Sequence, residues 1–241
     1  MKSALIIVGS PEHFGYGHLN RMRLLAFELK RHKWSSQIIC TDDDEIVRAQ
    51  IDFNILLLDR RDTSFPNISP KPSFDFHRVT IDNRGDSRNN SDATFDILPH
   101  PDQSEIEFFL SLRRLILHDA IAERPSAAHQ ATIQLIEPPD TVVADFSQSP
   151  VSTNEGLLRL SSNEYIRKID EAKTVRCYYG QTFFEALYLG KHIYLECISD
   201  YHKKLSATFI ERTKLYPRWL EYFDGKGTQH LAREIIALTE A

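Results

Sequence analysis

The chain has little cysteine, and its cysteines show no pairing pattern. Of 241 residues only three are cysteine, at positions 40, 177 and 197, and no two of them form a CxxC motif. This argues against a zinc site and against a disulfide framework. Because each cysteine lies in an apolar, strand-like run, we expect buried and inert thiols in a protein of the reducing cytoplasm.

Long runs of one residue type are also missing. No extended basic stretch occurs and the formal net charge is −5, which argues against nucleic-acid binding. No apolar run reaches the length of a membrane span, and the short run at residues 4–8 predicts a buried strand instead of a signal peptide. The histidines show no metal-ligand spacing such as HxH or HExxH, so we expect neither a metal nor a cofactor.

The hydrophobic content of 41% is sufficient for a buried core. Continuous apolar runs predict strands of a parallel sheet with both faces covered, and helical periodicity lies between them. In the first half we expect strands at 4–9, 36–41, 53–58, 76–82 and 94–98, helices at 19–31 and 42–50, and a helix, or a helix and then a strand, within 103–118. In the second half we expect strands at 141–146, 156–160, 174–179 and 192–197, and helices at 163–171, 182–189, 201–212 and 227–239.

Prolines at positions 125, 138 and 139 punctuate the middle of the chain. Strand–helix alternation on both sides of them predicts two Rossmann-like α/β domains with parallel sheets. We place these domains at residues 1–122 and 123–241, the second being the smaller. A cleft between them would be lined by the two motifs described next.

The first motif is Gly15-Tyr16-Gly17-His18, followed by Arg21. It follows the first predicted strand, and its glycines would let a tight turn approach an anion at a helix N-terminus. His18 would then stand at the helix start, where a neutral imidazole can act as a general base. The motif taken alone also fits a capping turn with a surface histidine.

Two further features bear on this first motif. A dinucleotide fingerprint would need a third glycine where Asn20 stands, although Asp42 at the end of the second strand is in keeping with one. Asp82 ends another predicted strand, where it could orient His18, bind a sugar hydroxyl or, with Asp86, simply build the turn. The charged residues 59–62 we interpret as a solvated cluster.

The second motif runs from Gly180 through Gln181, Thr182 and Glu185 to Gly190. The amides of its helix start could hold a phosphate, and the carboxylate one turn later could accept bonds from the two hydroxyls of a ribose. The same residues fit a capping box with Thr182 as N-cap and Glu185 as its partner, and Gly190 is a helix C-cap on either interpretation.

Three blocks together resemble a known family: GYGHLNRMRLLAFELK, VTIDNRGDSR and CYYGQTFFEALYLGK. The chain is similar to the UDP-sugar hydrolase of pseudaminic acid biosynthesis and the related spore-coat polysaccharide biosynthesis proteins. These share the GT-B glycosyltransferase architecture. The resemblance implies that His18 assists water attack at the anomeric carbon, that Glu185 holds the uridine ribose, and that Gly180 and Thr182 contact phosphate, without a metal.

The expected function is therefore a sugar-nucleotide hydrolase in surface polysaccharide or nonulosonic acid biosynthesis. His18 and Asp82 are the candidate catalytic residues. The candidate substrate-binding residues are Gly15, Tyr16, Gly17, Arg21, Gly180, Gln181, Thr182 and Glu185. Two alternatives remain open: a GT-B glycosyltransferase with a UDP-sugar donor, and a non-catalytic sugar-nucleotide-binding or partner protein, because Tyr179 stands where the family has a second glycine.

Overall fold

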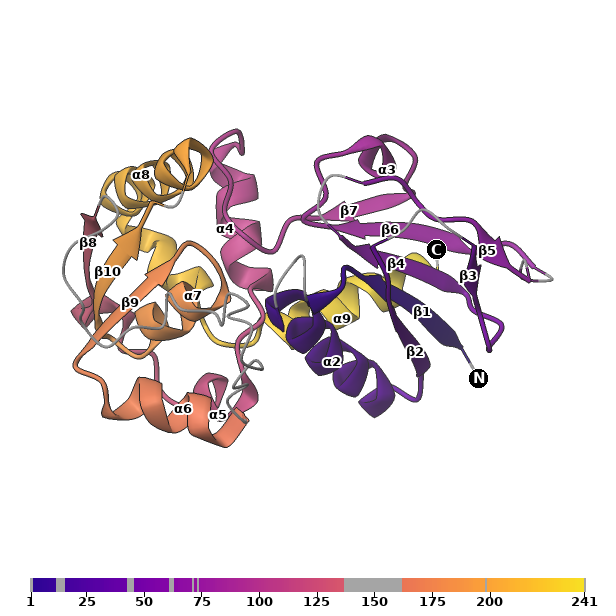
Figure 1. Cartoon of the computed structure of the whole chain (residues 1–241), viewed down its shortest axis with the longest axis horizontal. Helices are drawn as coiled ribbons and strands as arrows, with labels where there is room; N and C mark the ends of the chain where they lie inside the picture. The colour runs from indigo at the N-terminus through magenta and orange to yellow at the C-terminus, as the bar shows by residue number, and fades with distance from the viewer. Residues whose placement is uncertain are drawn as a thin grey trace, which may run out of the picture. The chain divides into compact units, whose positions relative to one another are not determined.

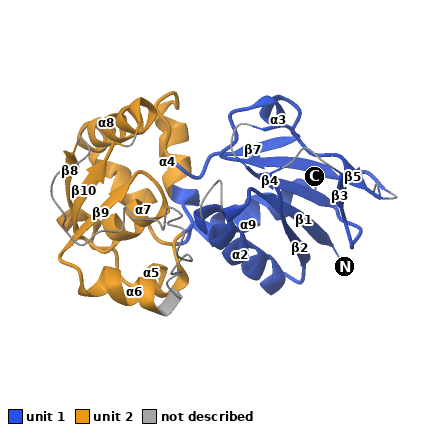
Figure 2. Ribbon diagram, viewed as in Figure 1, with its two compact units in different colours: residues 1–98, 113–116, 226–241 blue, residues 99–112, 117–225 orange. Residues whose placement is uncertain are grey.

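A computed structural model describes residues 2–11, 16–42, 46–60, 63–70, 72, 74–136, 162–197 and 199–240. By its internal contacts the chain divides into two compact units, coloured separately in Figure 2. Unit 1 comprises residues 1–98, 113–116 and 226–241, and unit 2 comprises residues 99–112 and 117–225. These units are not identical with the domains 1–122 and 123–241, whose limits stay a prediction.

Unit 1 is built on a five-stranded parallel sheet with the order β2-β1-β4-β6-β7. Its strands are β1 (Ser3–Val8), β2 (Ser35–Cys40), β4 (Ile55–Asp59), β6 (His77–Ile81) and β7 (Ala93–Phe95). All side chains of β1 and β4 are buried, as their continuous apolar sequences predict for central strands covered on both faces. The five strands predicted in this half are confirmed with end shifts of a few residues.

Two helices from opposite ends of the chain cover one face of this sheet (Figure 1). They are α2 (Tyr16–Arg31) and α9 (Gly227–Leu238), and they pack against each other. The apolar stripe of α2, which includes Met22, Leu25 and Leu29, joins the buried residues of α9 in one core with the sheet. The helical periodicity of the sequence thus predicts the buried face of α2 correctly.

Short strands and loops cover the other face. Leu5, Ile7, Leu56 and Leu58 form a second core there, with Phe53 packed among them. The two-residue strands β3 (Val47–Arg48) and β5 (Ile68–Ser69) pair in parallel beside this core. The helix predicted at 42–50 is therefore wrong in its described part. Burial of the Val47 side chain in this core outweighs the helix propensity of the segment.

The order of the strands indicates where a ligand would bind on this sheet. From β1 the chain moves outward to β2 on one side, and then returns to β4 on the other side before continuing to β6 and β7. The strand order therefore reverses between β1 and β4. In open parallel sheets, ligands bind beyond the carboxyl ends of the strands at such a reversal.

Unit 2 contains a three-stranded parallel sheet with the order β8-β10-β9. Its strands are β8 (Thr132–Ile136), β9 (Thr174–Tyr178) and β10 (His192–Glu196). Its helical elements are α4 (Glu105–Arg114, which continues into unit 1), α5 (Asp119–Ala122), η1 (Ala128–Gln130), α6 (Ser162–Glu171), α7 (Gln181–Tyr188), α8 (Asp200–Leu215) and η2 (Pro217–Tyr222). A short helix, α3 (Asp86–Asn89), belongs to unit 1.

Aromatic rings fill the core of unit 2. Phe183 and Phe184 of α7 contact Phe209 of α8 at ring-centroid distances of 5.3 and 5.5 Å. Tyr179 lies against both α7 rings and donates a hydrogen bond to the Pro99 carbonyl at 2.8 Å. The residue that replaces the expected glycine is thus a structural part of this core.

The remaining sequence predictions, most of them from the second half of the chain, are confirmed only in part. Strands at 174–179 and 192–197 and the four helices are confirmed, and only a helix occurs within 103–118. Strand β8 is not predicted, and the predicted strands 141–146 and 156–160 lie outside the described residues. Of the cysteines only Cys177 is buried, whereas Cys40 at the end of an edge strand is exposed, so the expectation of three buried thiols is wrong.

Candidate functional site

The first motif lies beside the reversal of strand order. Among the described residues helix α2 runs from Tyr16 to Arg31, so Tyr16, Gly17 and His18 are all helical. This corrects the prediction that the helix starts at residue 19 after a turn at Gly17. Gly15 lies outside the described residues.

His18 contacts the last residue of β4. Its Nδ1 atom lies 2.8 Å from Oδ1 of Asp59, and its side chain is 14% exposed whereas that of Asp59 is fully buried. Asp59 and Arg60 are both buried, so the expectation of a solvated charge cluster is wrong for these two residues. The carboxylate in contact with His18 is thus that of Asp59, which was not among the residues predicted for the site.

Arg21 joins this contact from the next turn of α2. Its Nε donates to Asp59 Oδ2 at 2.7 Å, its Nη2 donates to Asp59 Oδ1, and its Nη1 lies 2.9 Å from Asp82 Oδ2. The guanidinium is buried, with a residue exposure of 5%. Burial alone would lower the pKa of Arg21, but the charges of Asp59 and Asp82 raise it above its ordinary value.

The same partners set the charge of Asp59. Burial alone would raise the pKa of this carboxyl, but the charge of Arg21 and the neighbouring His18 hold it well below its usual range. Asp59 is therefore ionised at every pH at which the protein would work. A guanidinium fork on both carboxylate oxygens is the strongest common form of such a pair.

Asp82 shapes the backbone after β6. It has a positive φ of 49°, a region that non-glycine residues seldom occupy. Its Oδ1 accepts hydrogen bonds from the backbone N–H groups of Ile97 at 2.7 Å and Leu98 at 3.0 Å. Asp82 therefore ties together the ends of β6 and β7 and presents its second oxygen to Arg21. Both of its predicted functional roles stay predictions.

Other carboxylates follow neighbouring strands at the same edge. Asp42 after β2 accepts a bond from the Ser10 backbone N–H at 2.6 Å and another from the Ser10 hydroxyl. Asp96 after β7 accepts bonds from Arg88 at 2.9 and 3.2 Å. Asp42 and Asp96 thus stabilise a loop and helix α3 through these bonds. We therefore assign the candidate site to the group around His18.

The bonding around His18 determines which imidazole nitrogen carries hydrogen in the neutral ring. An ionised carboxylate only accepts and a guanidinium only donates, so Nδ1 cannot satisfy Asp59 and Arg21 together. The contact with Asp59 is the shorter, 2.8 Å against 3.1 Å to Arg21 Nη2. We therefore assign the hydrogen to Nδ1 and the lone pair to Nε2. Such a ring can accept a proton at Nε2 and keep its orientation while doing so.

The second motif starts helix α7 in unit 2. Gly180 is the N-cap with an extended backbone, φ 171° and ψ −163°, and Gln181 and Thr182 form the first turn. No side-chain bond caps this helix, so the alternative interpretation of Thr182 and Glu185 as a capping box is wrong. Gly190 has a φ of 70° and follows the C-cap, as predicted.

Glu185 is completely buried and bonded on both oxygens. Its Oε1 accepts from the His118 backbone N–H at 2.9 Å and from Gln181 Nε2 at 3.0 Å, and its Oε2 accepts from the Tyr165 hydroxyl. Thr182 contacts the same tyrosine oxygen at 3.1 Å. Burial raises the pKa of Glu185, although these three donors act in the opposite direction.

The structure thus forms two groups from the sequence-predicted residues: His18, Arg21 and Asp82 in unit 1, and Gln181, Thr182 and Glu185 in unit 2. Three further residues belong to these groups and were not predicted from the sequence: Asp59 in the first, and Tyr165 and His118 in the second. Asp59 could have been found by the rule that singled out Asp82, because it also ends an apolar parallel strand. No motif in the sequence points to Tyr165, which α6 brings to Glu185 from 20 positions away.

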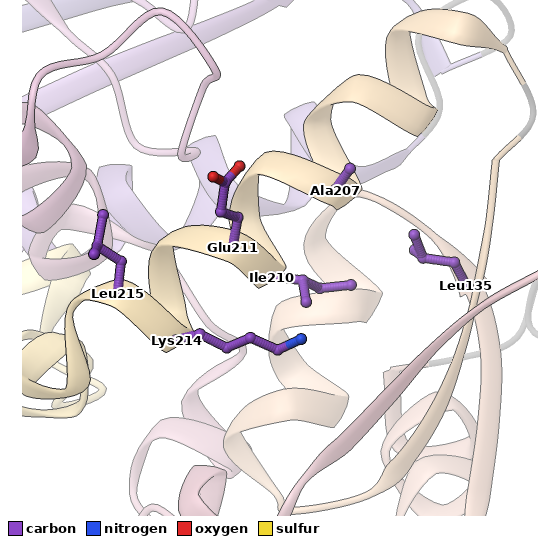
Figure 3. A pocket seen from close by; sticks show the side chains of 6 residues that line it. All are labelled: Leu135, Ala207, Ile210, Glu211, Lys214 and Leu215. Atoms are coloured by element: carbon purple, nitrogen blue, oxygen red, sulfur yellow. The ribbon is translucent and has the colours of Figure 1, made fainter.

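A surface hollow of about 560 Å³ lies elsewhere in unit 2, lined by Leu135 of β8 and by Ala207, Ile210, Glu211, Lys214 and Leu215 of α8 (Figure 3). Ile210 extends toward Leu135 across it. None of the predicted site residues belongs to this hollow. Its lining is mostly aliphatic, which is a poor match for the phosphates and hydroxyls of a sugar nucleotide.

Within the described part of the chain, no group of three or more His, Cys, Asp or Glu side chains is placed to hold a metal ion. The helices in that part include none with both the length and the apolar character needed to cross a membrane. Comparison of the whole chain with protein families, with curated proteins and with solved structures finds no match. The family resemblance therefore stays a prediction that depends on the motifs.

Proposed function

We propose that the protein is a sugar-nucleotide hydrolase, in which His18 activates water for attack at the anomeric carbon of a UDP-sugar. The observation that supports this most is the contact of His18 Nδ1 with the buried Asp59 at the reversal of strand order. A histidine held by a carboxylate at a ligand-binding edge of a parallel sheet is suited to general base catalysis.

In the proposed step, the water oxygen bonds to the anomeric carbon while Nε2 of His18 takes one of the water protons. The bond between the anomeric carbon and the phosphate oxygen breaks, and its electron pair leaves with the nucleoside diphosphate. The imidazolium that forms still donates a hydrogen bond from its Nδ1–H group to Asp59. A second proton of the attacking water remains on the new hydroxyl of the sugar.

The nucleotide would be held by the second motif. The N-terminus of α7 at Gly180 and Thr182 offers backbone N–H groups to a phosphate. Glu185 would accept hydrogen bonds from the ribose hydroxyls. For this, the hydroxyls must replace at least one of its present donors, which are Tyr165, Gln181 and the His118 backbone N–H. A glycosyltransferase would use the same base on an acceptor hydroxyl instead of water.

A non-catalytic nucleotide-binding protein is the second candidate, and two observations favour it. Tyr179 replaces the expected second glycine and is anchored in the core by its bond to Pro99. Glu185 is buried with both oxygens bonded by the chain's own donors. Under this second candidate, these side chains stabilise the fold of unit 2 and do not bind a ligand.

Release of UDP from a panel of UDP-sugars, assayed with the wild type and His18→Asn, tests the proposal. We expect the variant to lose about 10²–10⁴-fold in turnover, the usual contribution of a positioned base. Its nucleotide affinity should stay near that of the wild type. Equal turnover in both proteins would rule out His18 as the base. Turnover that appears only when a sugar acceptor is added would indicate a transferase, and binding without any turnover would favour the non-catalytic candidate.

A further inference from the structure

Arg21 is bonded inward in this structure. Its three guanidinium nitrogens all point to carboxylates, Nε and Nη2 to Asp59 and Nη1 to Asp82. With 5% of the residue exposed, the side chain offers little surface to a ligand. A phosphate that bound this guanidinium would have to displace one of two buried acids. This argues against the substrate-binding role that the sequence suggested for Arg21.

Three charged side chains surround the contact of His18 with Asp59. Asp59 and Asp82 together with Arg21 carry a formal charge of −1, and an imidazolium at His18 would bring the sum to zero. Removing Arg21 would leave Asp59 and Asp82 buried without their shared cation, and removing Asp59 would leave the imidazole facing the guanidinium of Arg21. Three elements thus supply the charges of this group: β4 supplies Asp59, α2 supplies Arg21, and the turn after β6 supplies Asp82, which contacts Arg21.

The geometry also determines the orientation of Asp59. The guanidinium fork binds both carboxylate oxygens and so fixes the rotation of the carboxylate, because Oδ1 cannot turn away from His18 without losing a bond to Arg21. The third guanidinium nitrogen of Arg21, Nη1, contacts Asp82. Asp82 in turn accepts hydrogen bonds from the backbone N–H groups of Ile97 and Leu98. The chain of contacts from the backbone to the imidazole is therefore continuous.

We propose that Asp59 and Arg21 are positioning residues that hold the neutral ring of His18 in the form with hydrogen on Nδ1 and the lone pair on Nε2. Asp59 accepts a hydrogen bond from the Nδ1–H group, and Arg21, anchored on Asp82, keeps the carboxylate ionised and aligned. The inference rests on the proposed function for the reaction that Nε2 serves, but its first test needs no substrate.

That test is a long-range ¹H–¹⁵N spectrum of the full chain with labelled histidine, recorded at increasing pH until the signals stop changing. His18→Asn identifies the His18 signals. We expect the Nδ1 shift of a protonated nitrogen and the Nε2 shift of an unprotonated one. A hydrogen on Nε2, or an average of the two forms, would overturn the proposal.

Asp59→Asn should abolish this preference and give averaged or reversed nitrogen shifts. Asp96→Asn is the matched control, because Asp96 also follows a parallel strand of the same sheet and binds an arginine, Arg88. It should leave the His18 shifts as in the wild type. Retention of the wild-type shifts in Asp59→Asn would overturn the proposal. If that variant does not fold, as judged by circular dichroism, the wild-type spectrum still decides.

Arg21→Lys separates positioning from substrate binding, because lysine keeps the charge but cannot form the fork. With a UDP-sugar that the wild type turns over, we expect kcat to fall about 10²-fold at nearly unchanged KM, the effect of a misaligned catalytic group. A raised KM at unchanged kcat would assign Arg21 to the substrate and overturn the positioning role. Absence of turnover in the wild type would refute the proposed hydrolase, whereas the spectrum would still test the His18 form.

Discussion

Nδ1 of His18 lies 2.8 Å from Oδ1 of Asp59, a residue 41 positions further along the chain. The two side chains meet because β4 lies next to β1 and ends beside the start of α2. Arg21 closes the group by binding the same carboxylate. This relationship combines a partly exposed imidazole with a fully buried acid, which is the arrangement that a positioned base requires.

Each unit contains one of the two tryptophans, Trp34 in unit 1 and Trp219 in unit 2, and both are buried. Their fluorescence can therefore follow the two units separately during urea unfolding. In a Trp219→Phe background the signal reports unit 1, and in a Trp34→Phe background it reports unit 2.

Unit 1 should lose stability in acid because of Asp59. The pKa of this residue is lower in the folded state than in the unfolded chain, so its contribution is present above the unfolded value of about 4. It is lost progressively as the pH falls from there toward the lower, folded value. In Asp59→Asn we expect a shallower decrease of the unfolding free energy below pH ~4, and a loss of roughly 3–5 kcal/mol at neutral pH.

The control for this prediction is Asp170→Asn. Asp170 pairs with Arg124 in unit 2, where both side chains are about one-third exposed, 34% and 38%. Loss of such a pair should cost at most about 1 kcal/mol. An acid dependence of unit 1 that is the same in Asp59→Asn as in the wild type would contradict the prediction.

Glu185 should give the stability of unit 2 the opposite pH dependence, with a loss as the pH rises. Burial raises its folded pKa, so its contribution is fully present below the unfolded value of about 4.3 and is lost as the pH rises through the folded value. Replacement by glutamine removes this titration. We therefore expect Glu185→Gln to flatten the decrease in unfolding free energy of unit 2 as the pH rises above ~4.3. A pH dependence like that of the wild type would show that Glu185 does not titrate in this way.

Loss of the Tyr165 hydroxyl should destabilise unit 2. Tyr165→Phe removes the donor to Oε2 of Glu185 and leaves that buried oxygen without its bond, at a cost of about 1–3 kcal/mol. Tyr222→Phe is the control, because Tyr222 stacks on Phe109 at 4.6 Å between ring centroids and phenylalanine keeps that ring. Urea unfolding in the Trp34→Phe background measures both variants, and equal losses would refute the importance of the bond to Glu185.

Two glycines of the second motif should respond differently to alanine. At Gly190 a Cβ atom would lie 2.7 Å from the Ala127 carbonyl oxygen in a backbone with φ 70°, so Gly190→Ala should cost about 1–3 kcal/mol. At Gly180 the nearest atom would be 3.7 Å away and the backbone is extended, so Gly180→Ala should stay within about 0.5 kcal/mol of the wild type.

Gly180→Ala therefore tests nucleotide binding without a change in folding. If a phosphate approaches this backbone closely, the added methyl group should weaken UDP binding. The stabilisation by UDP, which is about 2.7 kcal/mol at 100 times the dissociation constant, would shrink accordingly. Unchanged stabilisation by UDP in Gly180→Ala would mean that no phosphate lies against this residue.

The sequence by itself determined the type and order of most elements. Continuous apolar runs such as residues 4–8 and 55–58 encode buried parallel strands, and the stripe of Met22, Leu25 and Leu29 encodes the covered face of α2. These features depend on residues that are close along the chain, so the sequence alone is enough to predict them. They place His18 after the first strand and Glu185 after a later one.

Only the tertiary structure decided the partners of these residues. The strand order brings β4 next to β1 and so places Asp59 beside His18, although a charge cluster at 59–62 looks solvated in the sequence. Long-range packing in the same way adds α9 to the core of α2 and brings Tyr165 to Glu185. A buried carboxylate is stable only with donors around it, and those donors come from distant segments that meet when the sheet forms.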